Sequence, residues 1–403
     1  MKRKLIPLLL AAALLTACLS GCGSKPVKVD VTESPAPTSA PAATATEAPA
    51  PEETDDPEAL ARMARYKAAY EKYPADKVVL KIGDSPVTWG EYFSWIFDLG
   101  MDLEENVEFD DWNEALPDLA GAVLEATPDA YVRQRALGYS VQIAVIEQKA
   151  KELGVTLTQE QLDEVQATLD GYAEYFGGQE AFEELLADSY LPLEYFRRQN
   201  EAMILLDNLF EAIYGVDGAN LPEEDTVSFL KDAGYLYAKH ILFRTVDDDY
   251  QPLSDEEIAE KKAEAEGVLA QLRACDPADL ETLFDSLMMQ YSEDPGVLAY
   301  PDGYYFLAGQ MVPSFEEAVL SLEENGVSEL VETDYGFHII YCPPMRGDHV
   351  MEYDSNYTPY SPQAYVAARL FDDTVSGWFD SAKQSALYVD DFYALDLNEL
   401  IGK

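Results

Sequence analysis

The stretch Leu236–Thr245, LYAKHILFRT, carries one histidine in the middle of a run of strand-forming residues. Its β-branched and aromatic side chains predict a β-strand. A second such run, His338–Tyr341 (HIIY), predicts another strand that begins with a histidine. Between the two strands, the spacing of apolar residues predicts helices over 254–273, 279–291 and 315–322. Two strands that enclose three helices indicate a small α+β domain of about 110 residues.

Four short motifs fall within this domain. They are KHIL at 239–242, YSEDPG at 291–296, GQMVPSFEEA at 309–318 and TDYGFHII at 333–340. In this order and spacing they resemble the parvulin family of peptidyl-prolyl cis/trans isomerases, over roughly Tyr235–Pro344. Four motifs in register are a far more specific signal than any one of them alone.

The resemblance implies a four-stranded antiparallel sheet flanked by helices, with the site on its concave face. It implies that His240 and His338 pair on neighbouring strands and that Asp294 takes the family's acidic-or-thiol position, so these three are the candidate catalytic residues. The candidate substrate-binding residues are the pocket walls Met311 and Phe315, together with Phe306, Leu242 and Tyr335. We expect no cofactor, and no metal either, because no further ligand occurs at helical spacing beside the histidines.

Two stretches depart from the family's pattern. Where the family usually has Gly-Gly-Asp-Leu-Gly before an aromatic pair, this chain has YPDGYYF at 300–306, so we expect a different pocket rim. Phosphate-dependent members place Arg and Lys after the first strand, whereas here Asp247–Asp249 follow Arg244 closely. Three carboxylates repel a phosphate, and recognition of phosphoserine-proline is therefore disfavoured.

The N-terminal 57 residues predict an export signal and a linker. Residues 1–4 are MKRK, and the apolar run Leu5–Leu15 is too short to span a bilayer comfortably, so residues 1–21 are predicted to be a signal peptide. LSGC at 19–22 resembles the lipobox of bacterial lipoproteins, which implies cleavage before Cys22 and a lipid on that cysteine, with Cys18 as the alternative. Residues 22–57 are rich in Pro, Ala and Thr and predict a disordered tether.

The remaining sequence surrounds the predicted isomerase domain. Residues 58–233 predict helices and one early strand, and Val78–Thr88 resembles the opening of SurA/PrsA-type chaperone domains. Residues 83–86 predict the turn after that strand, and Thr88 is placed to cap a helix that runs through Phe97. Gly154 is predicted to end a later helix, and Thr158 to cap the next one. In such proteins the tail returns to complete the N-terminal domain, and a predicted strand at Leu387–Val389 is placed to do this. We therefore expect a helical chaperone-like domain over 58–233, an inserted parvulin domain over 234–346, and a completing helix and strand in 347–403.

Composition excludes several classes of partner. The 403 residues include 27 Lys and Arg against 76 Asp and Glu, a net charge of −49. Because such a surface repels phosphates, we expect no nucleic acid partner and no electrostatic docking to a membrane. Cys275 and Cys342 could pair after export or remain free thiols.

The sequence thus predicts a foldase that is lipid-anchored to the cell membrane on its extracytoplasmic face. It would bind unfolded or newly exported proteins and speed the cis/trans isomerisation of their X-Pro bonds. Two alternatives remain open: a holdase whose parvulin-like unit has lost activity, and a solute-binding lipoprotein. The second requires two similar α/β lobes, which the long helical run with few strands disfavours.

Overall fold

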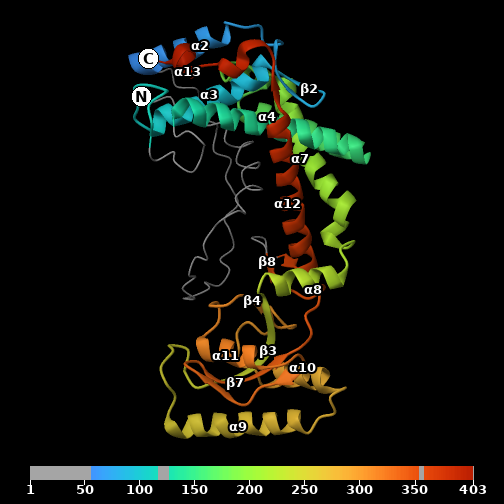
Figure 1. Ribbon diagram of the computed structural model, residues 1–403. Coiled ribbons are helices and arrows are strands. Elements are labelled where there is room, and N and C mark those ends of the chain that lie inside the picture. The colour runs from blue at the N-terminus through green and yellow to red at the C-terminus, as the bar shows by residue number, and fades with distance from the viewer. Residues whose placement is uncertain (1–55, 117–126, 354–357, 403) are drawn as a thin grey trace. The chain divides into compact units, whose positions relative to one another are not determined.

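A computed structural model describes residues 56–116, 127–353 and 358–402. The predicted signal peptide, Cys18, Cys22 and nearly all of the predicted tether lie outside these residues. The chain divides into two compact units (Figure 1). The first unit runs up to Ala212 and resumes at Asp372, and the second unit is Ile213–Phe371. Within the described ranges, no helix is both long and apolar enough to cross a membrane.

The first unit is mainly helical. Its helices, two of which extend past its limits, are α2 (Pro57–Tyr70), α3 (Trp89–Asn106), α4 (Pro128–Leu153), α5 (Gln159–Tyr175), α6 (Gln179–Asp188), α7 (Leu193–Tyr214), α12 (Pro362–Ser385), the 3-10 helix η3 (Asp390–Ala394) and α13 (Leu397–Ile401). Its sheet has the order β10-β1-β2, formed by β1 (Val78–Ile82), β2 (Ser85–Thr88) and β10 (Leu387–Tyr388). Helix α2 begins at Pro57, which was predicted to end the tether.

Local capping explains why several helices begin and end where the sequence predicts. Thr88 and Thr158 each form a capping box, in which the threonine side chain and the third helical residue satisfy each other's backbone amides. Gly154 ends α4 in the left-handed conformation, with φ of 69°. Helix α3 continues to Asn106, beyond the end predicted at Phe97, because Met101 and Leu103 extend its buried face.

The first hairpin is tighter than predicted. The turn was placed at residues 83–86, but Ser85 pairs with Ile82 and Pro86 with Lys81, so only Gly83 and Asp84 lie between the strands. Gly83 has φ of 57°, which glycine adopts without the steric cost of a side chain. On the other edge of β1, Leu80 pairs with Tyr388 of β10. The tail therefore returns to this sheet, while the domain boundaries at 233/234 and 346/347 stay predictions.

The second unit is a mixed α and β body, which confirms the predicted fold class. It contains η2 (Val216–Gly218), α8 (Glu223–Asp232), β3 (Leu236–Arg244), α9 (Asp255–Arg273), α10 (Leu280–Tyr291), β4 (Tyr304–Phe306), α11 (Pro313–Ser321), β5 (Gly326–Val327), β6 (Val331–Thr333), β7 (Gly336–Cys342), β8 (Glu352–Tyr353) and β9 (Pro359–Tyr360). The main sheet has the order β4-β3-β7-β5 with β6 also on β7, and every pairing is antiparallel.

The predicted four-stranded sheet has five strands, because the position beside β7 is divided in two. Strand β5 pairs with the end of β7 and β6 with its beginning. Between them, the Ser328 N–H donates to the Ile340 carbonyl at 2.8 Å, and the Ser328 hydroxyl accepts from the Ile340 N–H at 2.9 Å. A side-chain oxygen thus replaces a backbone carbonyl at this point, and the regular ladder is interrupted there.

Helices cover both faces of the main sheet (Figure 1). Helices α9 and α10 pack on one face, against Ile241, Phe243 and Ile339. Helix α11 packs on the opposite face with Ala238 and Ile340. Because side chains alternate along a strand, His240 and Leu242 share the α11 face with Ala238.

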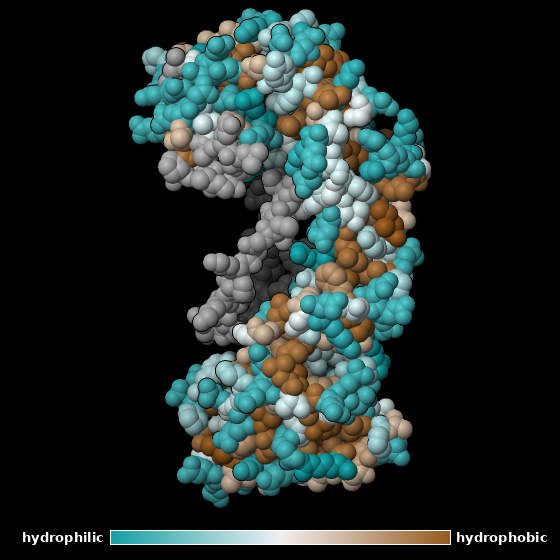
Figure 2. Space-filling model, viewed as in Figure 1, coloured by the Kyte–Doolittle hydropathy of each residue, from teal (hydrophilic) through white to brown (hydrophobic). Residues whose placement is uncertain are grey.

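Charged side chains lie mainly at the surface. Helix α9 buries Ala265, Val268, Leu269 and Leu272 and turns its many acidic residues to solvent. Figure 2 shows hydrophilic residues over much of the visible surface of each unit, with hydrophobic patches among them. This distribution lets a chain of such high net charge keep apolar cores.

The two described cysteines do not form a disulfide. Cys275 is half-buried, Cys342 is buried, and both are free thiols. Burial raises the pKa of the Cys342 thiol to about 11, so it stays protonated at neutral pH.

Candidate active site

The two candidate histidines meet on the α11 face of the sheet. In the β3–β7 register, Leu242 lies opposite His338 and His240 lies opposite Ile340, so the histidines are diagonal neighbours. Their Nδ1 atoms are 3.0 Å apart. The rings stack with centroids 5.2 Å apart and planes 21° from parallel. The structure therefore brings the predicted pair into direct contact.

Asp294 reaches the same place from the loop after α10. The Ser292 hydroxyl accepts a hydrogen bond from the Leu242 N–H at 3.2 Å, which ties this loop to β3. The Oδ2 atom of Asp294 lies 3.1 Å from Nε2 of His240. The other carboxylate oxygen accepts from the Gly296 N–H at 3.2 Å. The third candidate catalytic residue thus contacts the first one directly.

Two further residues complete this polar group. The Tyr304 hydroxyl donates to Oδ2 of Asp294 at 2.5 Å. On the other side, Oγ1 of Thr333 lies 2.9 Å from Nε2 of His338. An unbroken chain of contacts therefore runs from Tyr304 through Asp294, His240 and His338 to Thr333.

Burial and neighbouring charges set the protonation of two members of this chain. Burial, together with the nearby His240, lowers the pKa of His338 from 6.5 to about 3, so its imidazole is neutral at physiological pH. Burial alone would raise the pKa of Asp294, but hydrogen bonds from His240 and Tyr304 outweigh it and bring that pKa to about 2. Asp294 is therefore an ionised carboxylate that can only accept.

These charges fix the directions of the hydrogen bonds. Because the Asp294 carboxylate only accepts, Nε2–H of His240 donates to it. Nδ1 of His240 then accepts from Nδ1–H of the neutral His338, and Nε2 of His338 accepts from the Thr333 hydroxyl. The Thr333 hydroxyl also lies 3.4 Å from the Gly336 carbonyl oxygen. Each ring nitrogen of the histidine pair therefore has a hydrogen-bond partner.

Apolar residues lie beside the histidines. The Phe315 ring meets His240 edge to face at 5.3 Å and His338 at 5.6 Å. Phe306 lies 6.1 Å from Phe315, and Met311 packs in the same cluster. Leu242 is buried on the same face, opposite His338. Four of the five predicted substrate-binding residues therefore share the histidine face.

Tyr335 is the fifth, and it is placed differently. It lies in the turn between β6 and β7, is 40% exposed, and is not part of the Phe315 cluster. Its ring packs against Tyr250 at 6.3 Å. The backbone N–H of Tyr335 donates to Thr333 at 3.1 Å, so the tyrosine contacts a residue that holds His338.

Sequence reasoning missed Tyr304 and Thr333, although both stand in motifs that it used. Tyr304 comes two residues before Phe306 on one strand, and alternation therefore places both on one face. Thr333 pairs with Gly336 across the β6–β7 turn, which brings its hydroxyl to His338. Alternation could have found Tyr304, but finding Thr333 required the register of a strand that was not predicted.

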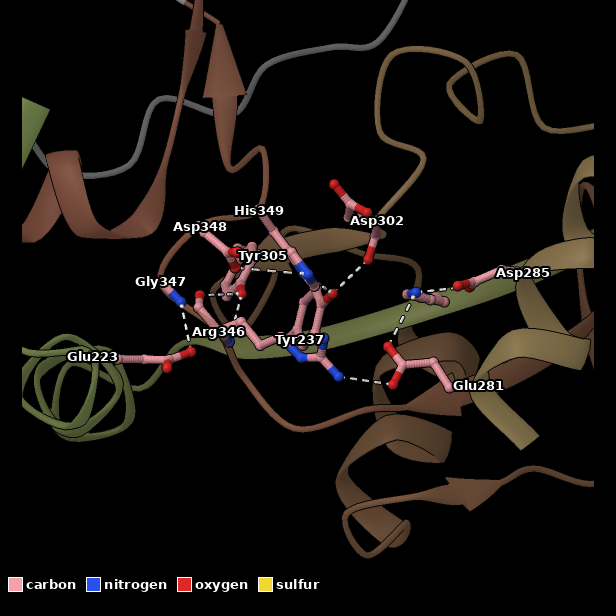
Figure 3. Close-up of polar contacts among 11 residues, drawn as sticks. Glu223, Tyr237, Glu281, Asp285, Asp302, Tyr305, Arg346, Gly347, Asp348 and His349 are labelled. Carbon is pink, nitrogen blue, oxygen red and sulfur yellow. Dashed lines mark hydrogen bonds and ion pairs between the residues drawn. The ribbon is translucent and has the colours of Figure 1, made fainter. Parts of the chain in front are cut away.

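The third histidine belongs to a different polar group (Figure 3). Nδ1 of His349 lies 2.7 Å from the Tyr237 hydroxyl, which also donates to the Asp302 carbonyl at 2.5 Å. The Tyr237 ring stacks on Tyr305 at 4.3 Å, and Arg346 pairs with Glu281 at 2.9 Å. Tyr237 is on the strand face opposite to His240, so this polar group lies away from the histidine pair. Its contacts hold Arg346 and His349, in the segment that follows β7.

The sequence of this region matches a known domain family. Residues 228–343, which contain all of the polar chain, match the PPIC-type PPIase domain. Residues 228–343 therefore form a parvulin-type domain. The resemblance predicted from four motifs is confirmed, and the match covers nearly the same residues. Among the described residues, no group of three or more His, Cys, Asp or Glu side chains is arranged to hold a metal ion.

Curated relatives contain similar stretches. The chain is 43% identical over 84 residues to foldase protein PrsA of Halalkalibacterium halodurans, which is 21% of this chain and 23% of that protein. It is 31% identical over 151 residues to chaperone SurA of Shewanella frigidimarina, which is 37% of this chain and 31% of that protein. These matches thus span less than a third of each relative. A crystal structure of PrsA from Bacillus subtilis, at 19% identity, aligns with 77% of this chain and 92% of that chain, with a TM-score of 0.24.

Proposed function

We propose that this protein is an exported foldase that catalyses cis/trans isomerisation of X-Pro bonds in other proteins. The observation that carries the proposal is the contact of His240 with His338, at 3.0 Å, beside the buried Phe315 ring. The parvulin-type domain supports the reaction class, and the relatives named foldase and chaperone support a role in protein folding.

The reaction requires rotation about a partial double bond, and no covalent bond needs to break. The barrier in water is about 18–20 kcal/mol. A pocket that excludes water favours the twisted amide, whose dipole is smaller than that of the planar form. Lowering the barrier by about 4–7 kcal/mol gives roughly a thousand- to hundred-thousand-fold acceleration. Phe315, Met311 and Phe306 would hold the proline ring, with Leu242 beside them.

The polar chain would orient the site. In this proposal the neutral His338 and its partner His240 face the twisting amide, and Asp294 holds His240 through Nε2. Asp294 makes no nucleophilic attack, because no step of the reaction needs one. Tyr335 would contribute only at the rim, since it is 40% exposed and lies outside the apolar cluster.

The proposed location is the extracytoplasmic face of the cell membrane. The basic start, the apolar run and the lipobox-like LSGC support export and a lipid on Cys22. The Pro-, Ala- and Thr-rich stretch would then separate the folded units from the membrane. The expected partners are unfolded or newly exported proteins with X-Pro bonds.

A proline-limited refolding assay tests this function. A client unfolded for long enough to equilibrate its prolines refolds in a slow phase, whereas the same client unfolded briefly keeps its native isomers and serves as control. We expect the full-length protein to accelerate only the slow phase, and His338→Ala to lose most of this effect. Suppressed aggregation without acceleration would contradict the proposal and favour the holdase.

A further inference from the structure

Tyr304 makes a close contact with the site residue Asp294. Its hydroxyl donates to Oδ2 of Asp294 at 2.5 Å, and the same oxygen lies 3.1 Å from Nε2 of His240. One carboxylate oxygen therefore receives a hydrogen bond from a tyrosine and from a histidine. The geometry of the histidine contact depends on where this oxygen is held.

The strand register places Tyr304 at this position. Tyr304 pairs with Ala238, two residues before His240 on β3, so its ring lies on the histidine face, 5.6 Å from the His240 ring. Two glycines, Gly303 and Gly296, leave room for Tyr304 to reach Asp294. A Cβ on Gly303 would lie 2.7 Å from the Ala238 carbonyl oxygen, and one on Gly296 would lie 2.0 Å from the Tyr304 hydroxyl. The backbone around Tyr304 is thus fitted to this contact.

Other aromatic rings hold Tyr304 from behind. Its ring packs on Tyr300 at 5.0 Å, and Tyr300 packs on Tyr353 at 5.6 Å. The Tyr353 hydroxyl in turn donates to the Ala299 carbonyl at 2.7 Å. Tyr300 and Tyr304 occupy the first and last positions of the run in which the parvulin pattern has glycines. This chain therefore supports its site with aromatic rings where the pattern has none.

The groups that face Asp294 come from three strands and its own loop. They are His240 on β3, Tyr304 on β4 and the Gly296 N–H, which bond to the carboxylate, and His338 on β7, whose ring interacts with its charge. Burial and the Asp294 carboxylate raise the pKa of Tyr304, so it remains a donor at neutral pH. Neither lysine nor arginine is among these groups, so the Tyr304 hydroxyl, the His240 ring and the Gly296 N–H orient Asp294.

We propose that Tyr304 is a positioning residue that clamps Asp294 against Nε2 of His240. The inference rests on the proposed isomerase function for its catalytic consequence, but the clamp itself can be tested without it. Loss of the hydroxyl removes one of two hydrogen bonds to Oδ2, so only His240 and the Gly296 N–H still hold the carboxylate. The contact of Asp294 with His240 is then less tightly fixed.

The test compares Tyr304→Phe with Tyr305→Phe in the full-length protein. Tyr305 is a matched control, because it is the next residue on β4 and its buried hydroxyl donates to the Arg346 carbonyl at 2.7 Å, outside the site. Carbon-13 NMR of the Asp294 carboxyl and nitrogen-15 NMR of the His240 ring report the clamp. We expect Tyr304→Phe to raise the pKa of Asp294 and to shift the His240 signals, and Tyr305→Phe to change neither.

The isomerisation rate adds a functional reading. We expect kcat/KM on a proline peptide to fall about tenfold in Tyr304→Phe, which corresponds to about 1.4 kcal/mol, with little change in Tyr305→Phe. If the wild type itself has no activity, the proposed function fails, while the NMR comparison still decides the clamp. A merely structural tyrosine would lower the thermal midpoint but leave the Asp294 pKa unchanged, and that result would overturn the inference.

A second measurement covers the case in which Tyr304→Phe does not fold. In the wild type, a hydroxyl proton held in so short a contact is expected as a slowly exchanging, low-field NMR signal. It should be absent from Asp294→Asn, which removes the charged acceptor. A wild-type spectrum without this signal, or one unchanged in Asp294→Asn, would overturn the clamp.

Discussion

The Nδ1 atoms of His240 and His338 lie 3.0 Å apart, although neither residue is directly opposite the other across the two strands. A contact between two ring nitrogens requires that one carries a proton and the other does not. The direction of that bond is set at the ends of the chain, by the Asp294 carboxylate on one side and the Thr333 hydroxyl on the other. The site is therefore one hydrogen-bonded unit.

The first prediction concerns Thr333, which lies at the His338 end of this hydrogen-bonded chain. Thr333→Val keeps the shape of the side chain and removes the partner of Nε2 of His338. His338 is only 4% exposed, so the orphaned nitrogen should cost about 1–3 kcal/mol of folding free energy. Urea unfolding followed by circular dichroism measures the change. Thr282→Val, at an exposed position of α10, is the control, and an equal effect in both variants would argue against the specific role of Thr333.

The second prediction is a pH dependence of stability that originates at His338. Its pKa is about 3 when folded and 6.5 in the unfolded chain, so the unfolded state binds the extra proton first as the pH falls. The contribution of His338 to stability is therefore fully present above pH 6.5 and is lost progressively between 6.5 and 3. From pH 7 to pH 5 the loss should be about 2 kcal/mol. His338→Gln should remove this dependence, whereas Asp294 contributes only at lower pH.

Amide hydrogen exchange in β3 and β7 can measure this loss, because it reports opening of the sheet itself. Tryptophan fluorescence reports the stability of the first unit at the same pH values and serves as the reference. All four tryptophans lie in that unit: Trp89, Trp95, Trp112 and Trp378. If protection in β3 and β7 is the same at pH 5 and pH 7 after correction for intrinsic exchange, His338 is not held neutral as described.

The third prediction uses two glycines of the second unit. Gly336 has φ of 147°, and a Cβ there would lie 2.1 Å from the Phe243 carbonyl oxygen, at the pairing of β3 with β7. Gly336→Ala should therefore destabilise the sheet by more than about 2 kcal/mol. Gly267 lies within α9 with open space around it, so Gly267→Ala should stabilise by about 0.5–1 kcal/mol. Thermal unfolding of the two variants should move in opposite directions; a shared direction would refute the steric argument.

The fourth prediction concerns Lys239, on the strand face opposite to the histidines. Its side chain is 2% exposed, and its Nζ lies 2.7 Å from Asp285 and 3.4 Å from Glu281. Removing both carboxylate charges, by Asp285→Asn with Glu281→Gln, strands a buried ammonium and should cost about 3 kcal/mol. Lys239→Met removes the charge with its partners still able to reach water and should cost less than about 1 kcal/mol. A larger cost for Lys239→Met than for the double variant would contradict this ranking.

Local signals predicted the fold well where they were sufficient. The capping boxes at Thr88, Thr158 and Ser254 and the left-handed Gly154 are decided within a few residues, and each helix begins or ends as predicted. The short strands β5 and β6 are held by β7 across the sheet, so their sequences carry little signal of their own. Helix α13 was missed because it is short and begins at a cap from Asp396.

The three residues at the centre of the candidate site were predicted, and the two residues at its ends were not. His240, His338 and Asp294 stand in recognisable motifs, and the structure brings all three together. Alternation before Phe306 could have indicated Tyr304, whereas the contact of Thr333 depends on the β6–β7 register and turn, which no pattern along the chain contains. Tyr335 is close to His338 in sequence, but its ring lies outside the apolar cluster, against Tyr250. Its part in substrate binding stays a prediction.

The most direct test of the central claim is exchange NMR on a short proline peptide with the full-length protein. It measures the cis/trans rate for wild type, His240→Ala and His338→Ala, with His349→Ala as the control histidine outside the site. The account predicts catalysed exchange in the wild type and in His349→Ala, and a loss of about a hundredfold or more in the other two. Wild-type catalysis that persists unchanged in both His240→Ala and His338→Ala would contradict it.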